Sequence, residues 1–110
     1  MASEEKEAVY QEFKENINMS PSEIEDWLDT DASRSVGVDS GDGESKGRKS
    51  AKKIIDIRRK KKGDLTEDDY SHMKKVNTYI KRHTAQQPSG DIEDSNWRYS
   101  LMNWGHDPVK

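Results

Sequence analysis

The residues best suited to binding chemistry form one cationic stretch, residues 45–62, with the sequence S-K-G-R-K-S-A-K-K-I-I-D-I-R-R-K-K-K. The stretch holds ten of the nineteen Lys and Arg residues of the chain and one of its twenty-two acids. Seven of these cations are Lys, whose ammonium groups attract phosphate with little selectivity for bases. The stretch therefore predicts binding to nucleic acid, DNA before RNA, with strong salt dependence and low sequence specificity.

The spacing of the apolar residues in this stretch predicts a helix rather than a loose basic arm. At about 100° per residue, one side of the helix would carry Ala51, Ile54, Ile55 and Arg58, and most of the cations would lie opposite. A docked helix with an outward cationic surface accounts for this arrangement. Gly63 is expected to end the helix in the left-handed conformation. The alternative is an ordinary solvated helix face, although such faces usually interleave Glu among the cations.

The cations of this helix are the predicted phosphate contacts, together with a weaker basic surface on the helix that follows. The predicted nucleic-acid-binding residues are Lys46, Arg48, Lys49, Lys52, Lys53, Arg59, Lys60, Lys61 and Lys62, flanked by Lys74, Lys81 and Arg82. Lys75 belongs to the same weaker surface. Such a protein is expected in the cytoplasm, associated with the nucleoid or the nucleus.

A second hypothesis is a protein interaction module whose basic helix docks on an acidic partner or on the acidic region of its own chain. Residues 1–44 carry thirteen acids and three bases, residues 45–62 one and ten, and residues 63–110 eight and six. The net charge of −3 therefore conceals a dipolar layout. An acidic amino-terminal third could shield the basic helix and weaken nonspecific binding to phosphate.

The histidines and the loops give no support for catalysis or metal binding. His72 and His83 lie eleven residues apart on one predicted helix, which separates them by about 16 Å, too far for one metal ion. The chain has no Cys, which excludes disulfides and thiolate chemistry. Residues 29–50 fit neither a calcium loop nor a phosphate loop. We therefore expect no enzyme, no cofactor and no metal, and histidines that are hydrogen-bonded or solvent-facing.

Two helices that form a hairpin are expected over residues 4–28. The first is predicted by apolar residues at helical spacing, and the second by an N-cap, a proline at the first helical position and a capping-box acid. These residues are Val9, Phe13 and Ile17 in the first helix, and Ser20, Pro21 and Glu23 in the second. Residues 29–44 lose the apolar pattern in favour of Ser, Asp and Gly. They are expected to form a flexible acidic linker, which Val36 and Val38 could tether.

The second half of the chain, residues 45–110, predicts two further helices after the basic one. A long helix is expected from an N-cap at Thr66, with Asp69 as the capping-box acid, to about Thr84. Its buried side would consist of Tyr70, Met73, Val76 or Asn77, and Ile80. A short aromatic helix is expected within residues 91–110, capped by Asp94 or Ser95, with Trp97, Leu101 and Trp104 on one face and Gly105 at its end. This helix either covers the core or presents an aromatic platform to bases or a peptide.

Together these elements predict a single all-α domain of four to five helices. Leu, Ile, Val and Phe number sixteen of the 110 residues, so a thin core supplemented by the aromatic residues is expected. No apolar run approaches the roughly 18 residues that a transmembrane helix needs. The amino terminus lacks the features of a signal peptide, so we expect a soluble intracellular protein without a membrane partner.

Two stretches after the basic helix carry a resemblance to a known family. They read G-D-L-T-E-D-D-Y-S-H-M-K-K-V-N-T-Y-I-K-R-H-T-A-Q-Q-P and D-S-N-W-R-Y-S-L-M-N-W-G-H-D-P. With Glu44, Ser45, Gly47 and Ser50 upstream, the chain resembles an uncharacterised family of small microbial proteins, a domain of unknown function whose members are often labelled DNA-binding. The resemblance covers nearly the whole chain, and the ending W-R-Y-S-L-M-N-W-G-H-D-P is its most specific part. It implies a class of partner, nucleic acid, and no catalytic residue.

Overall fold

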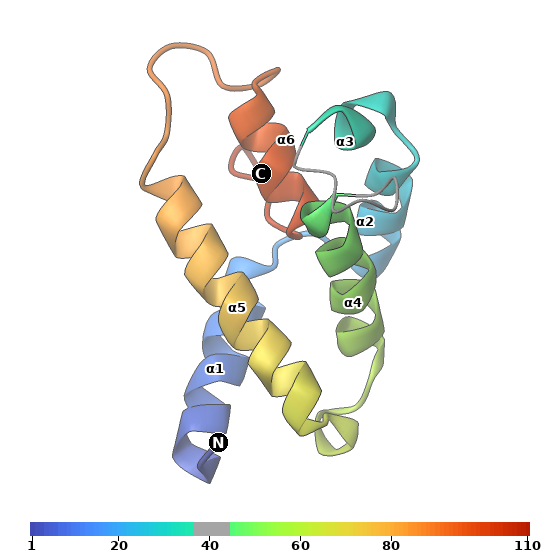
Figure 1. Ribbon diagram of the computed structural model, residues 1–110, viewed down its shortest axis with the longest axis vertical. Helices are drawn as coiled ribbons and strands as arrows, with labels where there is room; N and C mark the ends of the chain where they lie inside the picture. Colours follow the sequence, from blue (N-terminus) through green and yellow to red (C-terminus); the bar gives the residue numbers. More distant parts are fainter. Residues whose placement is uncertain (37–44) are drawn as a thin grey trace.

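The structure is a computed structural model that describes residues 1–36 and 45–110. The elements of this part of the chain are all helical, which confirms the all-α fold class (Figure 1). The α-helices are α1 (Ser3–Asn16), α2 (Pro21–Leu28), α3 (Asp31–Ser35), α4 (Lys46–Arg59), α5 (Glu67–Thr84) and α6 (Asn96–Asn103), with a short 3-10 helix η1 (Lys62–Asp64). Within the described residues, no helix is long and apolar enough to span a membrane.

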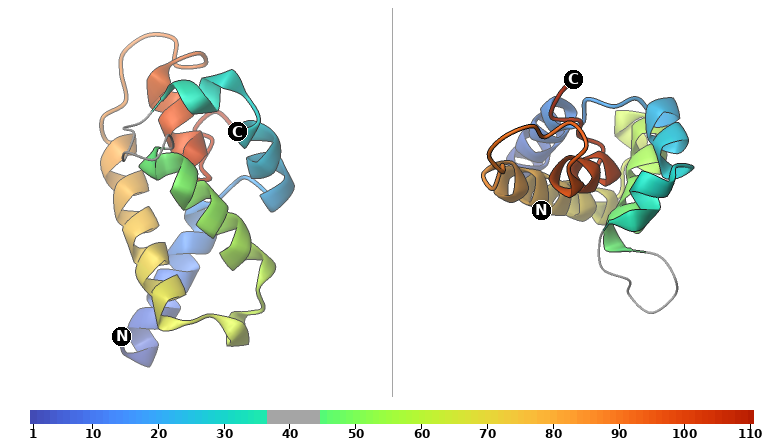
Figure 2. Two further views of the ribbon diagram at one scale, coloured as in Figure 1. Left: turned by 45° about the vertical axis from the view of Figure 1, so that its right-hand side comes forward. Right: turned by 90° about the horizontal axis from the view of Figure 1, so that it is seen from above.

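The first two helices do not form the predicted hairpin. Instead, α1 lies along α5, and α2 packs against α4 (Figures 1 and 2). The reason is that each helix buries its apolar face on a helix from later in the chain. Phe13 of α1 is 1% exposed and Ile24 of α2 is fully buried. The short α6 packs against α2, α3, α4 and α5 and completes the core.

The long helix α5 presents the predicted buried side to this core. Tyr70, Met73 and Ile80 are all buried, and so are both Val76 and Asn77, between which the sequence left the choice open. Asn77 is polar but buried, and its side-chain hydrogen bonds join α5 to α1. Its Nδ2 donates to the backbone oxygen of Val9 at 3.2 Å, and its Oδ1 accepts from Asn16 Nδ2 at 3.0 Å.

The predicted capping signals define where the helices begin. Ser20 caps α2 and Thr66 caps α5, each with a complete capping box, and Ser95 caps α6. The prediction for Gly63 is wrong, because α4 already ends at Arg59 and Gly63 lies within η1. Gly105 does end α6 as predicted, with a φ of +80°.

The predicted linker is helical over part of its length. Thr30 caps α3 through a hydrogen bond from the backbone N–H of Ser33 to its hydroxyl, at 3.1 Å. Ser33 is fully buried and Val36 is 5% exposed, so Val36 does tether this segment. The rest of the predicted linker, including Val38, lies outside the described residues.

We expect Asp69→Ala to lower the free energy of unfolding by about 1–2 kcal/mol, as is typical for loss of a helix cap. Asp69 is 3% exposed, and its carboxylate accepts hydrogen bonds from Lys60 Nζ at 2.8 Å and the Thr66 backbone N–H at 3.0 Å. Burial opposes ionisation, but these bonds outweigh it and lower the pKa of Asp69 below its ordinary 3.8.

The pH dependence of this stability follows from the lowered pKa of Asp69. Its stabilisation is present above pH 3.8, the ordinary pKa, and is lost as the pH falls through the lower pKa of the folded protein. Urea denaturation at pH 7 and pH 3 should therefore show a larger effect of Asp69→Ala at pH 7. The exposed neighbour Asp68, changed to Ala, is the control, and an equal effect of Asp69→Ala at both pH values would contradict the assignment.

Candidate polyanion-binding groove

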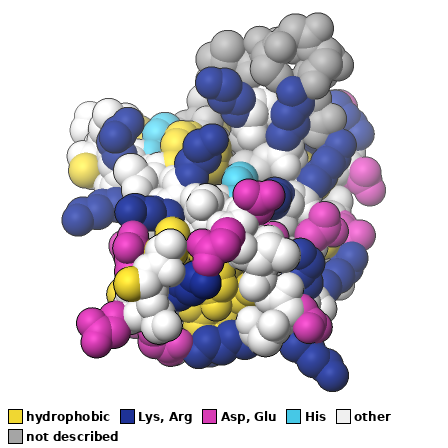
Figure 3. Space-filling view, turned by 60° about the horizontal axis from the view of Figure 1, so that its bottom comes forward, with side chains coloured by type: hydrophobic (Ala, Val, Ile, Leu, Met, Phe, Trp, Pro, Cys, Tyr) yellow, Lys and Arg dark blue, Asp and Glu magenta, His cyan; other side chains and the backbone are white. Residues whose placement is uncertain are grey.

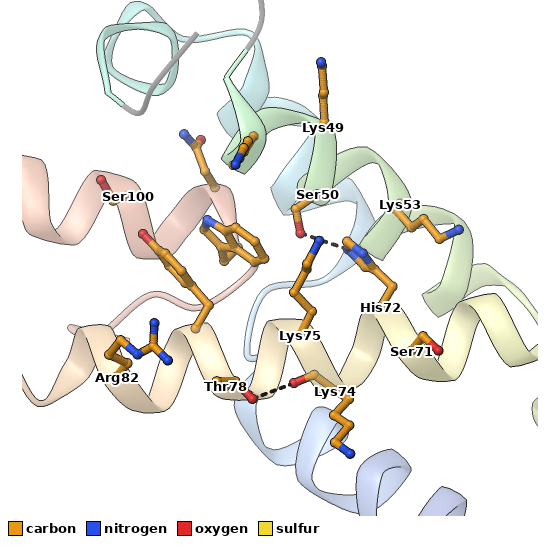
Figure 4. Close-up of a pocket in the computed structure, with 15 residues that line it drawn as sticks. Lys49, Ser50, Lys53, Ser71, His72, Lys74, Lys75, Thr78, Arg82 and Ser100 are labelled. Carbon is orange, nitrogen blue, oxygen red and sulfur yellow. Dashed lines mark hydrogen bonds between the residues drawn. The ribbon is translucent and has the colours of Figure 1, made fainter. Parts of the chain in front are cut away.

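An open groove of about 1010 Å³ lies between α4 and α5 and is bordered by α6 (Figure 4). Its two long walls carry cations: Lys46, Lys49 and Lys53 from α4, and Lys74, Lys75 and Arg82 from α5. The remaining lining residues are uncharged or histidine: Gly47, Ser50, Ser71, His72, Thr78, Tyr79, Ser100, Asn103 and Trp104. No carboxylate is among the described residues that line the groove. We call this feature the cationic groove.

The helical repeat explains why these side chains meet in the cationic groove. On α4, Lys46, Lys49 and Lys53 follow one another at intervals of three and four residues, which places them along one side of the helix. On α5, Lys75 and Arg82 are seven residues apart, which is two turns. Figure 4 shows Lys75 extending from α5 toward α4. Because the apolar faces of both helices point into the core, these cationic side chains lie at the solvent-exposed opening of the groove.

Five of the twelve predicted phosphate contacts line the cationic groove, namely Lys46, Lys49, Lys53, Lys74 and Arg82. Lys52, Lys61 and Lys81 are exposed but lie outside it. Lys75, which the sequence placed on the weaker basic surface but not among the twelve predicted contacts, also lines the groove. Its position on α5, three residues after His72 and seven before Arg82, is the signal that would have found it.

Arg48 has a structural role that the charge pattern did not reveal. Its Nη1 donates to the backbone oxygen of Leu28 and to Ser33 Oγ, both at 2.8 Å. The Ser33 hydroxyl in turn donates to Asn103 Oδ1 at 2.6 Å. The guanidinium group thus joins α4 to α2 and α3. Its Nη1 donors are used within the protein, and Arg48 is not among the residues that line the groove.

The carboxyl-terminal end of the basic stretch is neutralised by acids of the same chain. Lys60 pairs with Asp69 at 2.8 Å, Lys62 pairs with Glu7 at 2.5 Å, and Arg59 pairs with Glu25. Lys74, on the rim of the cationic groove, pairs with Glu5 at 2.9 Å. Figure 3 shows this face, where Lys and Arg side chains alternate with Asp and Glu. Three cations of the basic stretch therefore line the groove, and three others, Arg59, Lys60 and Lys62, form ion pairs with acids of the same chain.

Aromatic rings stack on one another behind the opening of the groove. Trp104 stacks with Tyr79 at a centroid distance of 4.2 Å and with His72 at 6.5 Å. His83 stacks with Tyr79 at 5.2 Å and with Trp97 at 6.1 Å. The ring faces are thus engaged within the protein, which favours the core-covering interpretation of the carboxyl-terminal helix over a platform for bases. We call these five rings the aromatic stack.

The comparison with known families places the chain in one of them. Residues 12–102 match a family described as protein of unknown function, DUF3140. The chain belongs to the DUF3140 family. The match confirms the resemblance to an uncharacterised family, and it ends inside the W-R-Y-S-L-M-N-W-G-H-D-P stretch. Searches of curated proteins and of solved structures found no match.

All three histidines of this DUF3140 chain are hydrogen-bonded, as expected. The Nε2 atom of His72 is 2.9 Å from Ser50 Oγ, and His83 Nε2 donates to the backbone oxygen of Trp97 at 3.3 Å. His106 Nδ1 donates to the backbone oxygen of Asn16 at 2.7 Å. In the described part of the chain, no group of three or more acids and histidines is arranged to hold a metal ion.

His72 is a titratable residue that lines the cationic groove, near Lys53 and Lys75. Burial lowers the pKa of His72 below its ordinary 6.5, and the nearby charges of Lys53 and Lys75 lower it further. The imidazole is therefore neutral at pH 7. Protonation would add a further positive charge to the cationic groove, and an anion bound there would favour it.

Proposed function

We propose that the cationic groove binds nucleic acid, DNA in the first place, through the phosphate backbone. The observation that carries this proposal is that six cations from two helices line one groove, and that none of the described residues lining it is a carboxylate. Such a surface attracts the phosphates of a nucleic acid whatever its base sequence, and it offers few groups that could distinguish one base from another. A role at the nucleoid or in the nucleus would follow from such binding.

The proposal is tested by titrating a fluorescently labelled DNA duplex at increasing salt concentration. If all six groove cations contact phosphates, with Lys74 exchanging Glu5 for a phosphate, log K falls against log salt with a slope of about −5. The variant Lys53→Glu with Lys75→Glu removes two groove cations that make no ion pair with a described residue. We expect it to weaken binding at least tenfold and to reduce the slope by about 2.

The matched control is Lys61→Glu with Lys81→Glu. Both lysines are exposed and lie outside the cationic groove, and the net charge changes by the same amount. We expect this control to weaken duplex binding much less than the groove variant. An equal loss in both variants would assign binding to net charge and not to the groove, and absence of duplex binding at 50 mM salt would remove the proposal.

The ion pairs of the basic stretch favour a second candidate, in which this region binds acidic protein segments, beginning with its own. Glu5 and Glu7 of α1 pair with Lys74 and Lys62. Deleting residues 1–44 cannot test this, because Phe13 and Ile24 belong to the core. The variant Glu5→Gln with Glu7→Gln removes the two charges and keeps the fold. An increase in duplex affinity of a few fold would show internal competition, and an unchanged affinity would contradict it.

We expect duplex binding to strengthen by a few fold as the pH falls from 7.5 to 5.5. Bound phosphates favour the charged form of His72, so binding is coupled to uptake of a proton, and a lower pH supports that uptake. The neutral variant His72→Gln should lose this part of the pH dependence, whereas His106→Gln, outside the groove, should retain it. A His72→Gln protein with an unchanged pH profile would contradict the prediction.

A further inference from the structure

The indole N–H groups of the three tryptophans differ in their hydrogen bonding. Trp27 Nε1 donates to Asn103 Oδ1 at 2.7 Å, and Trp97 Nε1 donates to the backbone oxygen of His83 at 2.7 Å. Trp104 is 9% exposed, yet its Nε1 has no acceptor within the described residues. A buried donor without an acceptor destabilises the folded protein. This group therefore calls for an explanation.

The unpaired N–H lies at the amino-terminal end of α4, where the cationic groove meets α6. A Cβ atom on Gly47 would be 3.2 Å from Trp104 Nε1 and 3.2 Å from Asn103 Cβ. Gly47 is the second residue of α4, a helix of 14 residues. Backbone N–H groups of a first helical turn lack acceptors within the helix, and the helix dipole is positive there. The Ser45 hydroxyl accepts from only one of them, the N–H of Arg48, at 3.2 Å.

Among residues 1–36 and 45–110, this corner brings together a cation, the first-turn N–H groups of α4 and the Trp104 N–H. Lys46, at the first position of α4, is exposed and lines the same groove. Gly47 and Trp104 line it as well. A small oxyanion would satisfy the indole N–H and the positive helix end together, whereas a cation or an apolar group would satisfy neither.

We infer that this corner binds one phosphate group, with the Trp104 N–H donating to a phosphate oxygen beside Gly47 and Lys46. The inference rests on the proposed function, because the phosphate is taken to belong to the nucleic acid in the cationic groove. This N–H would add one directional hydrogen bond to a groove whose other proposed contacts with phosphate are electrostatic attractions from Lys and Arg side chains. We call the corner the phosphate seat.

The direct test is the ¹H–¹⁵N spectrum of the uniformly labelled protein, in which each tryptophan gives one indole resonance. The three resonances are assigned with single Trp→Phe variants and followed during titration with a short DNA duplex and, separately, with inorganic phosphate. We expect the Trp104 resonance to move most with the duplex, while those of Trp27 and Trp97, whose N–H groups are already paired, stay in place. Inorganic phosphate should move the Trp104 resonance in the same direction at higher concentration.

The outcomes separate the phosphate seat from the proposed function. If fluorescence anisotropy shows that the duplex binds but the Trp104 resonance does not move, the phosphate seat is refuted. The Trp104 N–H is then hydrogen-bonded to water, and the proposal for the cationic groove stands. If the duplex does not bind at all, the nucleic-acid assignment fails for the groove and the seat alike. A shift with inorganic phosphate alone would then overturn nucleic acid as the source of the phosphate.

Substitution gives an independent measure of the same hydrogen bond. Trp104→Phe keeps an aromatic ring in the stack and removes the donor, and we expect it to weaken duplex binding about tenfold, as for loss of a hydrogen bond to a charged acceptor. Trp97→Phe removes a paired donor outside the groove and should leave duplex affinity unchanged. Thermal melting identifies any variant that fails to fold, and wild-type affinity in a folded Trp104→Phe protein would overturn the inference.

Discussion

Replacing Asn103 with Leu is expected to lower the free energy of unfolding by about 3–4 kcal/mol, since each unsatisfied buried polar group costs about 1–3 kcal/mol. Asn103 is 1% exposed. Its Oδ1 accepts from Trp27 Nε1 at 2.7 Å and Ser33 Oγ at 2.6 Å, and its Nδ2 donates to the backbone oxygen of Ser33 at 3.2 Å. A leucine of similar size fills the space but leaves these partners without hydrogen bonds. The junction of α2, α3 and α6 would thereby be weakened.

Urea denaturation followed by circular dichroism measures the effect of Asn103→Leu. The control is Asn96→Leu, because Asn96 is an exposed residue of the same helix and surface substitutions usually change stability by less than about 0.5 kcal/mol. A loss below about 1 kcal/mol in Asn103→Leu would mean that the three hydrogen bonds contribute little beyond packing.

The second large effect is expected from Phe13→Ala, at about 3–5 kcal/mol. Phe13 is 1% exposed and belongs to the core through which α1 packs on α5. Removing the ring loses its transfer free energy and leaves a cavity in the core. Because small domains have a total stability of about 5–15 kcal/mol, a large part of the stability would be lost.

Phe13→Leu is the matched control, and its cost should be clearly smaller because most of the apolar volume remains. Both variants are compared by urea denaturation and by hydrogen exchange of the amides in α1 and α5. If Phe13→Ala exposes only the amides of α1 and leaves α5 protected, α1 unfolds separately and the predicted loss of global stability is wrong.

Signals that act over three or four residues account for what the sequence predicted well. Apolar residues at helical spacing identified α1, α2, α4, α5 and α6, and the capping pairs at Ser20 and Thr66 fixed two helix starts. A cap forms between residues that are neighbours in the chain, so no knowledge of the tertiary fold is needed to recognise it.

Contacts between distant residues account for what the sequence did not predict. The hairpin prediction failed because the partner of α1 is α5, and α3 depends on the burial of Ser33 beside Asn103. For the candidate site, the charge pattern alone could not separate Arg48, which bonds to Leu28 and Ser33, from the lysines of the groove. Nor could it show which cations meet Glu7 and Glu25, since those pairs form only in the folded chain.

The pairing of the first helix with a much later one has a consequence during translation. The hydrogen bond from Asn77 to Val9 joins residues 68 positions apart. At a synthesis rate of about 5–20 residues per second, α1 leaves the ribosome several seconds before α5 exists. During that time Val9 and Phe13 have no native surface to cover them and are open to chaperones. Thus α1 is synthesised before α5 and can complete its native packing only after α5 has formed.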